Sequence, residues 1–172
     1  PLPDEVVQAL DEAWSMTRTI AKTTKLILRC HHLLFEQILE LLSHTIDVQT
    51  LEFDSLLLNR TNSLSFQQNQ QFPFISNRNK IENVTIIKGI TLDKIQLCIL
   101  LFSQMKPLTI NLHKIQLESI LQFILLESNL SLLCLSKQRK DFFESVKTLI
   151  DSKELIRNYT IKHVNRKVYL WW

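Results

Sequence analysis

Residues 135–172 carry the clearest fold signal in the chain, and they read LSKQRKDFFESVKTLIDSKELIRNYTIKHVNRKVYLWW. Ser136 is suited to cap a helix, because its hydroxyl oxygen can accept a hydrogen bond from a free backbone amide of the first turn. Apolar residues then recur at three- and four-residue spacing, which predicts a helix with one buried stripe. The stripe consists of Phe142, Phe143, Val146, Leu149 and Ile150.

After this helix the apolar period changes from that of a helix to that of a strand. Between residues 159 and 172 apolar side chains alternate with polar or outward-facing ones, as in half-buried strands. Asn165, Arg166 and Lys167 form a short polar segment between the two alternating runs, which predicts a turn. A helix followed by a β-hairpin is the closing half of a winged-helix fold.

The segment upstream supplies the elements that a winged helix needs before its hairpin. Apolar spacing predicts a helix over 91–102, a short strand at 108–110 and a helix over 115–125, and residues 129–135 are expected to turn the chain into the helix at Ser136. The resulting order of helix, strand, helix, helix and hairpin is that of a winged helix. We therefore expect a mainly α protein with small β-hairpins and a winged-helix (helix-turn-helix) C-terminal domain.

Composition divides the chain into three parts. Residues 1–58 carry two predicted helices, at 3–21 and 24–42, and would be a helical region or a first winged helix. Residues 59–82 are rich in Asn and Gln, which predicts a polar flexible linker or insertion. Residues 83–172 would form the winged-helix domain.

Charge is distributed unevenly along the 172 residues, although the net charge is only +3. Residues 1–54 have nine acids and four bases, whereas residues 137–172 have four acids and nine bases. A basic C-terminal module beside an acidic helical region suits contact with nucleic acid or with an acidic protein surface. A solvated basic face without a partner would give the same pattern.

The sequence lacks the residues that several classes of function require. The only glycine is Gly89, which excludes a glycine-rich phosphate loop. No nucleophile, base and orienting group occur at recognisable spacing, so we expect no enzyme, no cofactor and no small-molecule substrate. No secretory signal opens the chain and no uncharged apolar run is long enough to cross a membrane, so we expect no membrane partner.

Metal-binding residues are also poorly placed. Cys30, Cys98 and Cys134 each lie in an apolar run predicted to be helical and are expected to be buried free thiols. His31 and His32 are neighbours, so on a helix they would point about 100° apart. We expect no metal site.

The apolar pattern resembles a known family over 91–172. The runs 95–101, 121–124 and 149–156, with Leu135-Ser136 entering the third helix, are similar to the C-terminal winged helix of origin-recognition and related initiator proteins. The tandem winged helices of yeast telomere-capping complexes have a similar pattern. Both resemblances imply a nuclear protein in a chromosome-bound complex for DNA replication or telomere maintenance.

The chain also resembles the C-terminal module of cullins, but it lacks the residue on which the function of that module depends. Residues 146–157, followed by the basic pair before Val168, are similar to that module. In cullins a modifier-accepting lysine lies just before this helix core, and the corresponding position here is near Phe143. An apolar side chain cannot accept the modifier, so the cullin function is not expected.

Two functions remain. The first is a non-catalytic scaffold that contacts other subunits of a multiprotein complex, with Trp171 and Trp172 as candidate partner-binding residues. The alternative is sequence-independent binding of duplex DNA, in which cations on the third helix and the wing contact phosphates. The candidate DNA-binding residues are Lys137, Arg139, Lys140, Lys147, Lys162, Arg166 and Lys167.

Overall fold

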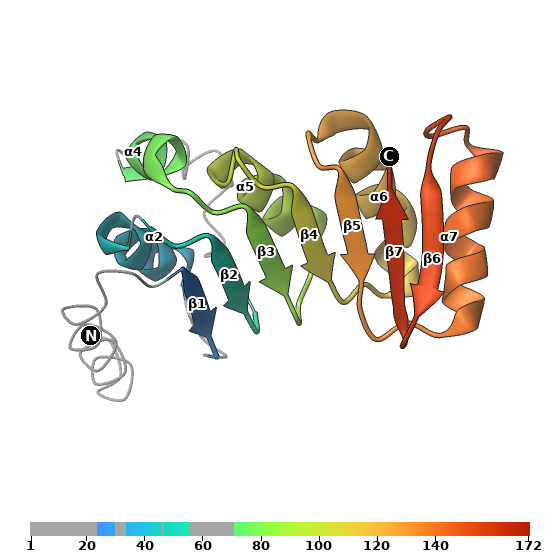
Figure 1. Cartoon of the computed structure of the whole chain (residues 1–172), viewed down its shortest axis with the longest axis horizontal. Helices are drawn as coiled ribbons and strands as arrows, with labels where there is room; N and C mark the ends of the chain where they lie inside the picture. Colours follow the sequence, from blue (N-terminus) through green and yellow to red (C-terminus); the bar gives the residue numbers. More distant parts are fainter. Residues whose placement is uncertain (1–23, 30–33, 46, 56–70) are drawn as a thin grey trace.

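A computed structural model covers the chain and describes residues 24–29, 34–45, 47–55 and 71–172 (Figure 1). Its centre is a seven-stranded mixed sheet in the order β1-β2-β3-β4-β5-β7-β6. The first five strands are parallel and follow one another in sequence order, and the C-terminal hairpin adds β7 antiparallel to β5. The strands are β1 (Lys25–Leu28), β2 (Thr50–Phe53), β3 (Asn83–Ile86), β4 (Pro107–Ile110), β5 (Leu132–Leu135), β6 (Thr160–Val164) and β7 (Lys167–Trp171).

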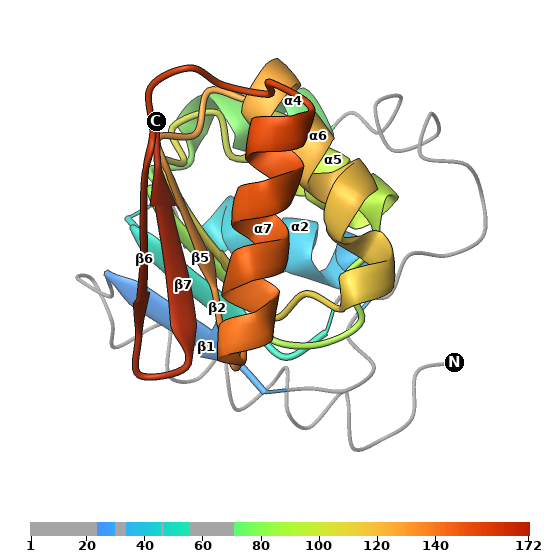
Figure 2. The ribbon, with the colours of Figure 1, turned by 90° about the vertical axis from the view of Figure 1, so that its right-hand side faces the viewer.

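The described helices all cover one face of this sheet (Figure 2). A crossover between parallel strands is almost always right-handed. Because each new strand is added on the same side of the last, every right-handed crossover places its helix on the same face. The helical elements are α2 (Phe35–His44), α4 (Gln71–Arg78), α5 (Leu92–Leu101), the 3-10 turn η1 (Lys114–Gln116), α6 (Leu117–Glu127) and α7 (Lys140–Ser152).

The core lies between the sheet and the helices and is built from alternate strand residues. Strands β2, β3 and β4 have the same burial pattern, in which the second and fourth residues are buried and the first and third are half-buried. Side chains of a strand alternate between faces, so these residues form two continuous apolar rows under the helices. The rows contain Leu51, Phe53, Val84, Ile86, Leu108, Ile110, Leu133 and Leu135, none more than 2% exposed.

Strand and helix repeat along the chain at nearly constant spacing. The five parallel strands begin at residues 25, 50, 83, 107 and 132, so three of the four steps are 24 or 25 residues and the step from β2 to β3 is longer. A strand–helix unit of this length is the size of leucine-rich repeats. One unit cannot bury its own apolar face, and stacking the units makes the core continuous.

This architecture overturns the predicted fold. The protein is α/β and not a mainly α winged helix. The predicted helices at 91–102 and 115–125 and the hairpin are present, but Leu132–Leu135 is a central strand where a turn was predicted. Four consecutive apolar residues gave no alternation to mark a strand. Cys134 faces the uncovered side of the sheet but is only 5% exposed, between Thr109 and Tyr169 of the neighbouring strands.

The predictions for the N-terminal half also differ from the structure. The helix predicted over 24–42 is instead β1 followed by α2, and the sheet continues from β2 into β3 without a domain boundary. In the segment predicted to be a linker, residues 71–82 form α4 and a packed connection with buried Phe72, Ile75 and Ile81. The helix predicted over 3–21 and residues 59–70 lie outside the described part of the chain.

The two faces of β3 provide a test of the architecture. Ile86 points into the core and is fully buried, whereas Thr85 beside it faces the uncovered side. We expect Ile86→Ala to lower the free energy of unfolding by about 2–5 kcal/mol through lost apolar burial and a residual cavity. Thr85→Ala, as the control, should lower it by no more than about 1 kcal/mol. Equal losses in urea unfolding would contradict the one-sided core.

Candidate polyanion-binding rim

The carboxyl ends of the parallel strands form one edge of the molecule. Every connection from a strand to the next helix starts at this edge, and α5, η1-α6 and α7 begin there because each runs back against the strands (Figure 1). Backbone amides at a helix N-terminus carry partial positive charge. The edge therefore has a positive electrostatic bias before any side chain is considered.

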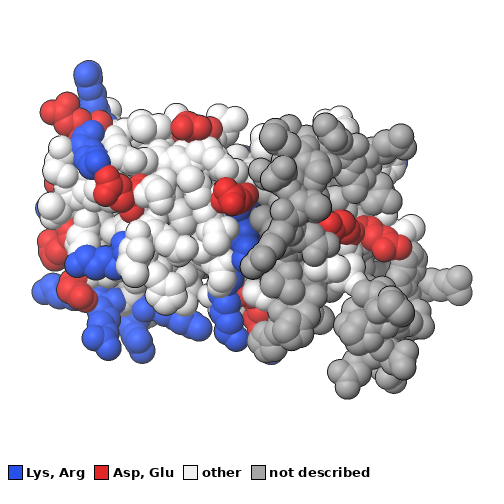
Figure 3. All heavy atoms as spheres, turned by 180° about the vertical axis from the view of Figure 1, so that it is seen from behind, with Lys and Arg blue, Asp and Glu red and all other residues white. Residues whose placement is uncertain are grey.

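Basic side chains are concentrated at the same edge. The connections at 87–91, 111–113, 136–139 and 165–166 contain no Asp or Glu. Lysine and arginine gather along the lower edge of the molecule in Figure 3, which is the edge where β3–β5 end. We define the basic rim as the seven exposed cations there: Lys88, Lys114, Lys137, Arg139, Lys140, Arg166 and Lys167.

The rim cations are available to a ligand. None of them forms an ion pair with a residue in the described ranges. The rim extends from β3 to β6, four inter-strand steps of about 4.8 Å, or about 19 Å. A few acids lie nearby: Asp93, Glu118 and Asp141 in the first turns of α5, α6 and α7, and Asp54 after β2.

The opposite edge of the sheet differs in character. There basic residues are mixed with acids, as in Lys153-Glu154. Two of the cations are in ion pairs: Lys80 contacts Asp47 at 2.7 Å, and Lys153 contacts Glu118. Among the described residues, the excess of positive over negative charge therefore lies at the carboxyl edge.

A buried amide holds the rim loops together. Gln138 is 6% exposed, and its Nε2 donates to the carbonyl oxygens of Leu112 at 3.0 Å and Ser136 at 2.8 Å. The backbone N–H of Gln138 donates to the carbonyl oxygen of Arg166 at 2.8 Å. One residue therefore joins the loop after β4, the loop after β5 and the hairpin turn.

One repeat earlier, Gln116 does the same for the preceding loop. Its Nε2 donates to the carbonyl oxygen of Ile90 at 2.9 Å, and both this bond and the Gln138–Leu112 bond join residues 26 apart. A buried carbonyl without a donor is costly, so these amides satisfy loops that the sheet ladder leaves open. They also fix the spacing of the cations on the loops.

Three residues in the loops of the rim have left-handed backbone conformations. Asn165 and Arg166 have φ of 50° and 60° and join β6 to β7 as a two-residue loop, since Val164 pairs with Lys167. Positive φ at both central positions is the requirement of a type I′ hairpin turn. Lys137, directly after β5, has φ of 59°. Cations thus occupy two positions where glycine would be less strained.

The structure brings together five of the seven residues predicted to bind DNA. Lys137, Arg139, Lys140, Arg166 and Lys167 all belong to the rim, although the predicted third helix and wing are α7 and the β6–β7 hairpin of an α/β fold and not parts of a winged helix. Lys147 is exposed halfway along α7, away from the edge. Lys162 lies on β6, on the uncovered side of the hairpin.

Sequence reasoning missed Lys88, Lys114 and Gln138. Lys88 stands two residues after β3 as Lys137 does after β5, and Lys114 stands four residues after β4 as Arg139 does after β5, so the 24- and 25-residue steps between strands are the signal that would have aligned them. For Gln138 the sequence gives no comparable signal. Its burial depends on the hairpin turn, which is distant in sequence.

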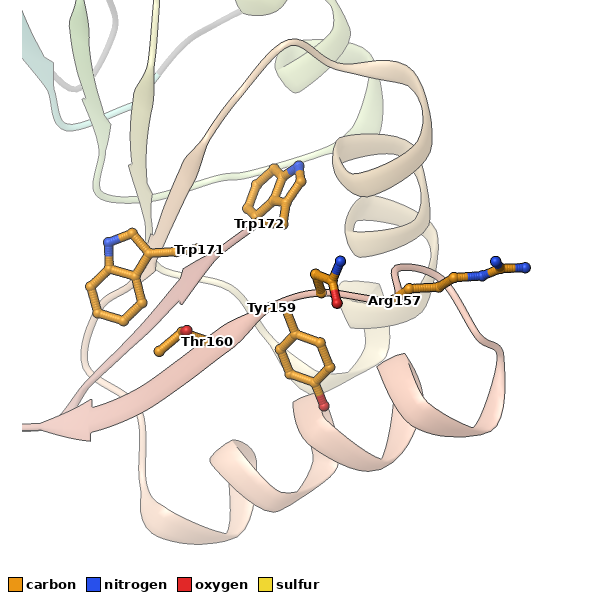
Figure 4. A pocket seen from close by; sticks show the side chains of 6 residues that line it. Arg157, Tyr159, Thr160, Trp171 and Trp172 are labelled. Carbon is orange, nitrogen blue, oxygen red and sulfur yellow. The ribbon is translucent and has the colours of Figure 1, made fainter.

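The two tryptophans predicted to bind a partner border a shallow hollow of about 450 Å³ at the other end of the hairpin (Figure 4). Trp171 projects away from α7, whereas Tyr159 directs its hydroxyl to Asp151 of α7, with 2.5 Å between the oxygens. Partial burial and Asp151 raise the pKa of Tyr159 to about 12. Arg157 and Asn158 complete the polar side of the hollow.

Other titratable groups near the sheet have structural roles. Burial lowers the pKa of Lys94, whose Nζ donates to the carbonyl oxygen of Gly89 at 2.6 Å. Burial raises the pKa of the Cys98 thiol to about 12. Cys98 and Cys134 are buried free thiols, as predicted, while Cys30 lies outside the described residues together with His31 and His32.

Metal-binding clusters and membrane-spanning helices are absent from the described ranges. No group of three or more His, Cys, Asp or Glu in them could hold a metal ion. None of their helices has the length and apolar character to cross a bilayer. Comparisons of the chain with protein-family models, curated proteins and solved structures gave no match.

We expect Gln138→Ala to lower the free energy of unfolding by about 1–3 kcal/mol, because two carbonyl oxygens lose a buried donor. The exposed Gln104, on the opposite edge, provides the control, and Gln104→Ala should change it by less than about 0.5 kcal/mol. Urea unfolding monitored by circular dichroism measures both. Equal stability of the two variants would show that the amide does not join the loops.

Proposed function

We propose that this protein is a non-catalytic binding module that holds nucleic acid by its phosphate backbone on the basic rim. The single observation that carries the proposal is the concentration of seven exposed cations, none paired with a described acid, on one edge. Phosphate contacts of this kind release counterions and supply affinity without reading sequence. Nucleic acid suits the rim because it offers regularly spaced negative charge over a length of at least 19 Å.

The architecture supports a binding role. The amide bonds of Gln116 and Gln138 preorganise the rim loops, so less conformational entropy is lost when a ligand binds. The N-termini of three helical segments point to the same edge and favour anions there. We found no arrangement of nucleophile, base and orienting group among the described residues that would favour a reaction.

The scaffold function, contact with other protein subunits, remains a second candidate. The observation that favours it is a set of large apolar side chains exposed on the helix layer, which soluble proteins usually cover when they form a patch. They are Phe74, Leu100, Ile115 and Leu126, with Ile115 97% exposed. Nuclear location and membership of a replication or telomere complex also remain predictions, although the fold behind that resemblance is different.

A double variant can remove charge from the basic rim without lowering the stability of the fold. Lys137→Gly with Arg166→Gly removes two rim cations at positions of positive φ, where glycine is less strained. We expect this variant to be at least as stable as the wild type. Its affinity for nucleic acid should fall, and the slope of log K against log salt should become shallower by about 0.7–0.9 for each lost phosphate contact.

The measurement is fluorescence anisotropy of a labelled oligonucleotide over a series of salt concentrations. Lys80→Ala with Lys106→Ala removes two cations from the opposite edge and is the matched control, with little expected change in slope. Absence of wild-type binding even at low salt would refute the proposed function. An unchanged slope in the glycine variant would exclude these rim residues from the interface.

A further inference from the structure

The hairpin presents aromatic and basic side chains on the uncovered face of the sheet. In β7, Val168 and Leu170 are fully buried against the helix layer, so Lys167, Tyr169 and Trp171 point to the opposite face. Pairing with β6 places Lys162 opposite Tyr169 and Thr160 opposite Trp171. Side chains that build the core and side chains that point to the uncovered face thus alternate along β7.

The aromatic rings on this face form a platform. Tyr169 and Trp171 are stacked, with 5.9 Å between ring centroids and an interplanar angle of 18°. Lys162 on β6 and Lys167 at the start of β7 flank the rings with positive charge, and both lysines are exposed. A pair of parallel rings beside cations matches bases and phosphates of an unpaired strand.

The platform connects two features described above. Lys167 and the neighbouring Arg166 belong to the basic rim, and Trp171 lines the hollow of about 450 Å³ at the other end of the same strand. The hollow is also lined by Trp172, Asn158 and Arg157, whose guanidinium extends away from the two tryptophans (Figure 4). An amide side chain such as that of Asn158 can donate to or accept from a base edge.

We propose that the ligand of this face is single-stranded nucleic acid, with phosphates on Lys162, Arg166 and Lys167 and bases stacked on Tyr169 and Trp171. This inference rests on the proposed function and specifies the form of its ligand. Bases in a duplex are stacked on one another and cannot lie against protein rings, so a duplex could use only the cations. The rings and cations on one strand therefore favour an unpaired ligand.

The test compares a labelled oligothymidylate of about 15 nucleotides, within the usual site sizes for single strands, with a duplex of the same length. The protein is the full chain carrying Trp14→Phe, so that only Trp171 and Trp172 emit. We expect tighter binding of the single strand, with quenching of tryptophan fluorescence. The duplex should bind more weakly and leave the emission nearly unchanged.

Variants of Trp171 and Lys162 test which side chains contact the bases and the phosphates. Trp171→Ala should weaken single-strand binding roughly 5- to 150-fold, the range that corresponds to losses of one stacked base. Trp171→Phe keeps a ring and should retain most of the affinity, and thermal melting checks that both variants fold. Lys162→Ala should lower the salt slope by about 0.7 in the same assay, whereas Lys106→Ala should not.

Each outcome bears on one of the two proposals. Equal affinity for single strand and duplex, or an unchanged affinity of folded Trp171→Ala, would overturn the stacking inference and leave the rim as a phosphate-binding surface. Absence of binding to either ligand at low salt would refute the proposed function as well. Binding of an acidic peptide with quenching, but of no oligonucleotide, would replace both by a protein-binding role.

Discussion

The handedness of the crossover connections is the constraint on which the rest of the structure depends. Right-handed crossovers combined with sequential strand order place every described helix on one face. No helix among the described residues covers the other face, and the loops that lead from these strands to helices start at a single edge. One covered face, one free face and one loop edge therefore follow from the chain's topology.

Different kinds of side chain occupy the covered face, the free face and the loop edge. Apolar residues at the second and fourth positions of β2, β3 and β4 make the core, and the intervening residues point to the other face of the sheet. In β7 those free positions hold a lysine and two aromatic residues. At the loop edge, Gln116 and Gln138 satisfy carbonyl groups that a parallel sheet leaves unpaired and so fix the cations around them.

Much of the C-terminal half could be predicted from sequence, but its topology could not. The Phe142–Val146–Ile150 stripe marks α7, and alternation marks the hairpin, because both signals are local. Leu132–Leu135 gave no such signal. Cys134 points to the uncovered face, but the neighbouring β7 covers it, so an apolar residue is found there and the four residues do not alternate. Missing this strand, together with β1 inside the helix predicted over 24–42, turned a repeating strand–helix pattern into an apparent winged helix. The basic residues of 137–140 and 166–167 were found because they are clustered in sequence, whereas Lys88 and Lys114 join them only through the fold.

Hydrogen–deuterium exchange of the full chain, with and without a bound oligonucleotide, tests the central claim most directly. The account predicts slower exchange in the loops at the carboxyl edge, 87–91, 111–116 and 136–140, and in the hairpin at 160–171, which no winged helix would group together. Segments 79–82, 103–106 and 128–131 at the opposite edge should exchange as before. Slower exchange confined to those opposite-edge segments would contradict both the position of the rim and the function inferred from it.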